Sequence, residues 1–145
     1  MVWGAVWWTG KTDLYFVNTG QSIDAVKYVE ILESTLLPAV GSMSRRLLQQ
    51  DLATPHTATL TKDWLLAHNI AWIKDYPPNA GDLSVVDHVW SWMAKRVRDK
   101  KPRTRAALTQ AIKDAWSELT QEHIRTSSNT STKRWENAET TEDFL

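Results

Sequence analysis

The sequence predicts an α/β protein in which helices pack on a small mixed sheet. Short β-branched and aromatic runs alternate with longer segments whose apolar residues recur every three or four positions. This alternation gives the order strand, strand, helix, strand, helix, strand, helix, helix, which is typical of a layered α/β domain. A chain of 145 residues suits one domain, and folding at that size buries roughly two thirds of the chain's surface.

Each predicted element has its own signal. Strands are predicted where β-branched and aromatic residues cluster, at 2–8, 13–17, 46–51 and 70–73. Helices are predicted where apolar residues keep a helical period, at 22–38, 57–69, 84–99 and 104–124. Ser22 is the expected N-cap of the first helix, and Pro38 is its expected stop. The predicted domain therefore covers residues 1–124, and the Ser-, Thr- and Glu-rich residues 125–145 are expected to form a disordered polar tail.

Composition excludes several classes of protein. The 17 basic and 17 acidic residues balance, so net charge gives no indication of a nucleic-acid partner. The absence of cysteine excludes a disulfide framework and a thiolate metal site. No segment approaches the roughly 18 consecutive apolar residues of a membrane span, and no secretory leader is recognisable at the start. We therefore expect a soluble intracellular protein without a membrane partner.

Asp51 is the first candidate metal ligand. It stands at the end of a predicted strand, in the segment Gln49-Gln50-Asp51-Leu52-Ala53-Thr54-Pro55-His56-Thr57-Ala58. Strand ends are where α/β folds usually place ligand-binding groups, and Mg²⁺ prefers hard carboxylate oxygens. An Asp ahead of Thr-Pro also commonly caps the next turn, and taken alone this structural interpretation is the better one.

Asp87 is the second candidate ligand. The segment Ser84-Val85-Val86-Asp87 matches a capping box, in which the acid bonds back to the start of the helix. A first-turn acid can also point toward a neighbouring strand end, so the two interpretations are compatible. The 35 residues between Asp51 and Asp87 form a predicted helix, a short strand and a Pro-rich loop, a layout that can bring both acids to one metal site.

Taken together, these segments resemble the Tc/mariner superfamily of DDE/D transposases. Matching segments run in order from residue 1 to about residue 120. They are Met1-Val2-Trp3-Gly4-Ala5, Gly10-Lys11-Thr12-Asp13-Leu14, Tyr28 with Ile31-Leu32-Glu33 and Leu36-Leu37-Pro38, the Asp51 segment, Leu60-Thr61-Lys62 with Trp64-Leu65 and Asn69-Ile70, Asp82-Leu83 with Asp87 and Trp90, and Lys95-Arg96-Val97-Arg98. In this alignment Asp51 and Asp87 stand at the second and third acids of the family's catalytic trio.

The resemblance implies a fold, a chemistry and a partner. The fold would be ribonuclease H-like, a mixed sheet flanked by helices, here lacking the first, central strand that carries the family's first acid. Asp51 and Asp87 would be catalytic acids that bind Mg²⁺ or Mn²⁺, with their carboxylates within about 10 Å of each other. Family members cut transposon ends and join them to target DNA in the nucleus, and the resemblance also leaves a homo-oligomer open.

Departures from the family pattern predict that this chain is inactive alone. Leu52 and Thr54 stand where the family usually has Asn and Pro, and the proline steps around Asp82 are replaced by Ala80-Gly81 and Ser84-Val85. Proline fixes the backbone of such turns, so their loss removes rigid support for the acids. The expected first acid also has no counterpart. We therefore interpret the chain as a transposase fragment that does not cleave DNA alone.

A basic cluster supports a rival interpretation. Between residues 95 and 105 lie seven basic residues and one acid; six of these basic residues are candidate DNA ligands: Lys95, Arg96, Arg98, Lys100, Lys101 and Arg103. Such a cluster can follow a phosphate backbone, and it is equally typical of a solvated helix end. The rival is a non-catalytic DNA-binding or protein-interaction fragment. A third alternative is a pseudogene-like product with no function.

Overall fold

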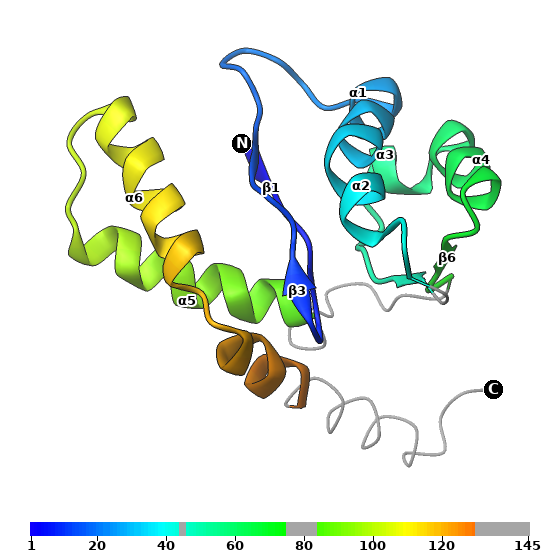
Figure 1. Cartoon of the computed structure of the whole chain (residues 1–145). Coiled ribbons are helices and arrows are strands. Elements are labelled where there is room, and N and C mark those ends of the chain that lie inside the picture. Colours follow the sequence, from blue (N-terminus) through cyan, green and yellow to red (C-terminus); the bar gives the residue numbers. More distant parts are fainter. Residues whose placement is uncertain (44–45, 75–83, 130–145) are drawn as a thin grey trace, which may run out of the picture. The chain divides into compact units, whose positions relative to one another are not determined.

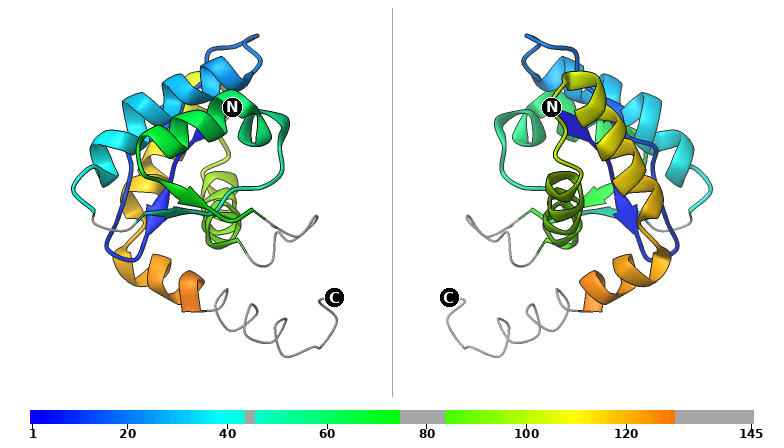
Figure 2. Two further views of the ribbon diagram at one scale, coloured as in Figure 1. Left: turned by 90° about the vertical axis from the view of Figure 1, so that its right-hand side faces the viewer. Right: turned by 90° about the vertical axis from the view of Figure 1, so that its left-hand side faces the viewer.

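The computed structural model describes residues 1–43, 46–74 and 84–129. Figures 1 and 2 show the chain coloured along its sequence. The chain divides into two compact units. The first unit holds Met1–Ala5 and Lys11–Ala80, and the second holds Val6–Gly10 and Gly81–Leu145. Each unit is described below by itself. None of the helices in the described part combines the length and apolar character that crossing a bilayer requires.

The chain opens with a hairpin, as the sequence predicts. Strands β1 (Val2–Trp3) and β4 (Tyr15–Phe16) pair antiparallel in the first unit, with Val2 opposite Phe16. Further along the same hairpin, β2 (Val6–Trp7) pairs with β3 (Gly10–Lys11). The strands are only two residues long in each case, shorter than the apolar runs that predicted them.

A long helical segment follows in three parts. These are α1 (Ala25–Ile31), the π-helical turn η1 (Leu32–Leu36) and α2 (Leu37–Val40), and Figure 1 shows α1 and α2 continuing one another. The predicted N-cap Ser22 is wrong, because Asp24 Oδ1 accepts a hydrogen bond from the Lys27 amide at 2.8 Å. Pro38 does not stop the helix either. Proline crowds the preceding turn of an α-helix, and the wider π turn just before it relieves that conflict.

The rest of the first unit packs on this helix. Strand β5 (Leu47–Leu48) is followed by α3 (Thr54–Thr57), α4 (Thr59–Ala67) and β6 (Ala71–Trp72), and β5 pairs parallel with β6. Helix α1 contacts both α3 and α4. The core is formed by the buried side chains of Tyr28, Ile31, Leu32, Leu36, Val40, Leu65 and Ile70.

A Schellman motif ends α4 and directs the chain into β6. Asn69 has φ +54°, its amide donates to the Leu66 carbonyl, and the Ile70 amide donates to the Leu65 carbonyl at 2.9 Å. Leu65 and Ile70 are both buried, which is the apolar contact that commonly accompanies this motif. The motif therefore fixes where β6 begins, and so where β5 finds its partner.

The second unit is mainly helical. Helix α5 (Val85–Asp99) contacts α6 (Arg105–Glu118), and the Trp90 and Trp116 rings stack with centroids 5.7 Å apart. Ser84 caps α5, as the sequence predicts. Thr104 caps α6, because its hydroxyl oxygen accepts a hydrogen bond from the Ala107 amide. Residues 121–129 are also helical, and Ile124 is buried. The disordered tail predicted from residue 125 is therefore wrong for residues 125–129, whereas residues 130–145 lie outside the described residues.

Candidate functional site

The parallel pair β5 and β6 leads the chain to Asp51. The Ala71 amide donates to the Arg46 carbonyl and the Ile73 amide to the Leu48 carbonyl, the slanted pattern of parallel strands. Asp51 lies three residues beyond the end of β5, in the connection to α3. Its side chain is 68% exposed, so the carboxylate is open to solvent, as a ligand for an incoming cation must be.

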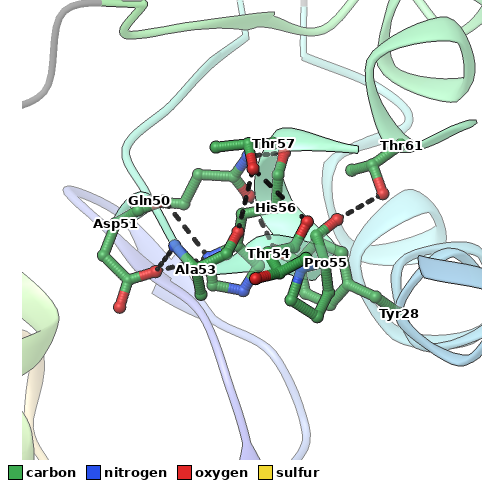
Figure 3. A network of polar contacts seen from close by, with 9 residues as sticks. All are labelled: Tyr28, Gln50, Asp51, Ala53, Thr54, Pro55, His56, Thr57 and Thr61. Atoms are coloured by element: carbon green, nitrogen blue, oxygen red, sulfur yellow. Dashed lines mark hydrogen bonds and ion pairs between the residues drawn. The ribbon is translucent and has the colours of Figure 1, made fainter. Parts of the chain in front are cut away.

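The two carboxylate oxygens of Asp51 have different surroundings. Oδ1 accepts hydrogen bonds from the Ala53 amide at 3.0 Å and from His56 Nδ1 at 2.6 Å. Among the described residues, Oδ2 has no hydrogen-bond partner, and Figure 3 shows one carboxylate oxygen of Asp51 pointing away from the network. Asp51 thus makes the local turn that the structural interpretation predicted and still offers one free oxygen.

A chain of contacts connects Asp51 to helix α1 (Figure 3). The buried Tyr28 hydroxyl donates to Gln50 Oε1 at 2.8 Å, and Gln50 Nε2 donates to the His56 carbonyl at 3.2 Å. The Tyr28 and His56 rings lie 4.4 Å apart between centroids. Burial raises the pKa of Tyr28, so its hydroxyl remains a proton donor at neutral pH. The sequence interpretation missed this role of Tyr28 and Gln50, although both lie in segments that resemble the family.

A shallow pocket of about 210 Å³ adjoins Asp51. Its lining comes from the loop after β5, from α3, from α4 and from β6 with the two residues after it. The lining residues are Gln50, Asp51, Leu52, His56, Thr57, Lys62, Trp72, Ile73 and Lys74. Lys62 and Lys74 have no ion-pair partner among the described residues. The pocket therefore combines one free carboxylate oxygen with two unpaired cations, a combination suited to a phosphate and a divalent ion.

Asp87 lies in the first turn of α5 and is exposed. Its backbone amide donates to Ser84 Oγ at 3.3 Å, which confirms the predicted cap. Asp87 belongs to the second unit and Asp51 to the first, so their predicted approach to one metal site stays a prediction. Across the described residues, no three or more His, Asp or Glu side chains are grouped as metal ligands.

The basic cluster of residues 95–105 divides into paired and unpaired cations. Lys100 Nζ lies 2.8 Å from Asp114 Oδ2, and Arg96 Nε lies 3.4 Å from Glu118 Oε2, so both cations pair with acids of α6. The hydrogen bond to Asp114 raises the pKa of Lys100, and the same bond lowers the pKa of Asp114. Arg96 also covers the Trp92 ring, 3.6 Å from its centroid. These two cations are already committed to contacts within the unit.

The remaining cations of the cluster are free for another partner. Lys95, Arg98, Lys101, Arg103 and Arg105 are exposed, and none has an ion-pair partner among residues 84–129. Lys101 follows the end of α5 and precedes Pro102. Its φ of +47° is the left-handed conformation that commonly ends a helix. Fewer cations of the predicted cluster are therefore available to DNA than the sequence indicates. The available ones lie on α5, in the turn after it and at the start of α6.

Comparison with characterised proteins gives related transposases. The chain is 30% identical over 129 residues to the transposable element Tc3 transposase of Caenorhabditis elegans, which covers 86% of this chain and 38% of that protein. It is 26% identical over 121 residues to the Tcb2 transposase of Caenorhabditis briggsae, covering 82% of this chain and 43% of that one. The chain thus spans about two fifths of the length of these curated relatives. No protein-family model matches it.

Solved structures with the same fold come from a mariner transposase. The Mos1 transposase catalytic domain in a structure with Raltegravir and Mg superposes with a TM-score of 0.83 at 17% identity, covering 99% of this chain and 76% of that one. A second structure of the Mos1 mariner transposase catalytic domain gives a TM-score of 0.82, also at 17% identity, and covers 93% and 70%.

The fold is that of the Mos1 catalytic domain, the ribonuclease H-like fold that the family resemblance implies. Within that class, the sequence relatives are Tc/mariner transposases. Over most of its length the chain is similar to Tc/mariner transposases, and it matches part of the Mos1 catalytic domain in fold.

Proposed function

We propose that this segment contributes to a DDE/D transposase that cleaves and joins DNA strands, with Asp51 and Asp87 as two of its metal ligands. The observation that carries the proposal is the Asp51 carboxylate, which lies beyond a parallel strand and offers one free oxygen beside a pocket with unpaired lysines. The relatives are transposases, and the Mos1 domain has been solved with Mg and with Mn. DNA is the proposed partner and the nucleus the proposed location.

The residues present fit a divalent ion. Asp51 Oδ2 is a hard oxygen donor that is free and exposed, and Asp87 is an exposed carboxylate on a capped helix. Asp51 and Asp87 would hold Mg²⁺ or Mn²⁺ together with further acids, and the bound ions would supply activation of the attacking hydroxyl and charge stabilisation of the leaving oxygen. The protein itself supplies the orientation: the Ala53 amide and His56 fix the direction of the Asp51 carboxylate, and Lys62 and Lys74 would attract the adjacent phosphate.

Metal binding by acid variants tests this proposal. Asp51→Ala and Asp87→Ala should each weaken Mn²⁺ binding, because each removes a ligand and its charge. Asp63→Ala is the matched control, because Asp63 is an exposed acid on α4 that makes no ion pair with the described residues. Mn²⁺ affinity would be followed through the electron paramagnetic resonance signal of the free ion. Equal affinities in all four proteins would refute the assignment of both acids.

The segment alone is expected not to cleave DNA. Two acids of the trio lie in these 145 residues, whereas the two-metal reaction must hold the attacking and leaving oxygens at the same time. The purified segment would be incubated with duplex DNA and Mn²⁺, in parallel with Asp51→Ala. Cleavage by the wild-type segment that Asp51→Ala abolishes would show that the family's first acid, which has no counterpart here, is dispensable, and the expectation of inactivity would be wrong.

A second function is favoured by a specific observation. The exposed, unpaired cations Lys95, Arg98, Lys101, Arg103 and Arg105 form a surface that can contact DNA phosphates without catalysis. Non-catalytic DNA binding would survive Asp51→Ala and Asp87→Ala unchanged. Strand transfer by a longer protein containing this segment would not survive them, so the two functions are separable by the same variants.

A further inference from the structure

The described residues suggest a specific role for His56, which the chemistry of the two acids does not assign. His56 Nδ1 lies 2.6 Å from Asp51 Oδ1, and its ring is only 22% exposed, whereas the Asp51 side chain is 68% exposed. A short hydrogen bond from a half-buried ring to an exposed carboxylate restricts the carboxylate more than the ring. The direction of the free Oδ2 is therefore set by His56 together with the Ala53 amide.

His56 is itself held from two sides. Its ring lies 4.4 Å from the ring of Tyr28, and its backbone carbonyl accepts a hydrogen bond from Gln50 Nε2. Gln50 is in turn oriented by the Tyr28 hydroxyl, which donates a hydrogen bond to Gln50 Oε1. Tyr28 is a buried residue of α1. These contacts link the exposed carboxylate of Asp51 to the packed side of α1; Figure 3 shows the residues of this network.

We propose that His56, supported by Tyr28 and Gln50, is a positioning residue that makes Asp51 a one-oxygen ligand of fixed direction. The inference rests on the proposed function, because it assumes that Asp51 binds a divalent ion. Hydrogen bonds to a ligating carboxylate raise metal affinity, since the ligand does not have to be ordered when the ion binds. His56 acts only through Asp51 and does not itself bind the ion.

Two substitutions of similar size separate positioning from simple stabilisation. The amide of Asn can reach the place of Nδ1, whereas the amide of Gln reaches the place of Nε2. His56→Asn should therefore keep the hydrogen bond to Asp51 and most of the Mn²⁺ affinity. His56→Gln should lose the bond and weaken Mn²⁺ binding by about tenfold or more. Both variants are polar and fill part of the same space, so their thermal stabilities should be similar.

The experiment titrates the full 145-residue chain and its variants with Mn²⁺ up to millimolar concentration, using the electron paramagnetic resonance signal of the free ion. Thermal unfolding of each protein is recorded by circular dichroism. A tenfold loss in His56→Gln, with rescue in His56→Asn and equal melting temperatures, supports positioning. Equal affinities in the two variants, or an affinity loss that follows a loss of stability, overturns it.

Asp51→Ala in the same titration separates the two proposals. If Asp51→Ala weakens Mn²⁺ binding and His56→Gln does not, the positioning role is wrong while the metal site stands. If Asp51→Ala binds Mn²⁺ as the wild type does, Asp51 is not a ligand, and both proposals are overturned.

Discussion

The salt dependence of DNA binding should distinguish the free cations of α5 from the paired ones. Arg98 and Lys101 are exposed and have no ion-pair partner among the described residues, whereas Arg96 and Lys100 pair with Glu118 and Asp114. Each pair consists of one Arg and one Lys from the same part of the chain. Replacing either pair by Ala therefore removes the same charge from the cluster, although loss of Arg96 and Lys100 also leaves Glu118 and Asp114 without these partners.

The expected magnitude follows from counterion release. Each neutralised phosphate of duplex DNA contributes about 0.9 to the slope of log affinity against log salt concentration. Loss of Arg98 and Lys101 should lower the slope by about 1.8 if both contact phosphates. Between 50 and 200 mM salt, a slope change of that size alters the fall in affinity by about 12-fold. The Arg96 and Lys100 double variant should change the slope much less.

Fluorescence anisotropy with a labelled duplex, repeated at several salt concentrations, measures both slopes. A second, unrelated duplex sequence should give the same slopes, since phosphate contacts do not read bases. Equal slope changes in the two double variants would show that net charge alone matters. An unchanged slope in the Arg98 and Lys101 variant would show that the cluster is an ordinary solvated surface, and the DNA-binding proposal would lose its main support.

Two further predictions concern stability. Asn69→Val should destabilise the chain by about 1–2 kcal/mol, because a β-branched residue tolerates the φ of +54° poorly. Asn69→Gly should be neutral or stabilising. In thermal unfolding, Asn69→Val should melt about 2–8 °C lower, and equal melting temperatures of the two variants would contradict the Schellman assignment. Gly10→Ala should also destabilise by about 1–3 kcal/mol, because the new Cβ would lie 2.5 Å from Trp7 Cζ2; urea unfolding at wild-type stability would show that the ring moves away freely.

The sequence predicted the elements of the fold better than their ends. Ser84 could be predicted as a cap because an N-cap hydrogen bond joins residues only three apart. The prediction that the helix stops at Pro38 was wrong, because the local rule for proline does not take into account a π turn just before it. Within α6, the large apolar residue Leu108 is 42% exposed, while the smaller Ala111 and Ala115 are buried. Which stripe is buried depends on the partner helix, and periodicity alone does not specify that partner.

The pairing of the basic cluster could not be predicted for a similar reason. Lys100 and Asp114 are 14 residues apart, and their contact exists only because α5 and α6 pack together. Composition counts both as surface charges of opposite sign. The structure divides the cluster into cations that stabilise the helix pair and cations that remain available, and only the second group is informative about DNA.

Asp51 shows why a structural and a functional interpretation need not compete. The sequence favoured a turn-forming role for this acid when it was considered alone, and Oδ1 does accept the Ala53 amide. A carboxylate has two oxygens, however, and fixing one of them directs the other. The turn, His56 and the buried Tyr28 together hold the group so that Oδ2 stays exposed beside the pocket. A metal site benefits from such local contacts. A carboxylate that rotates freely has to be ordered when the ion binds, and this ordering lowers the affinity of the site for the ion.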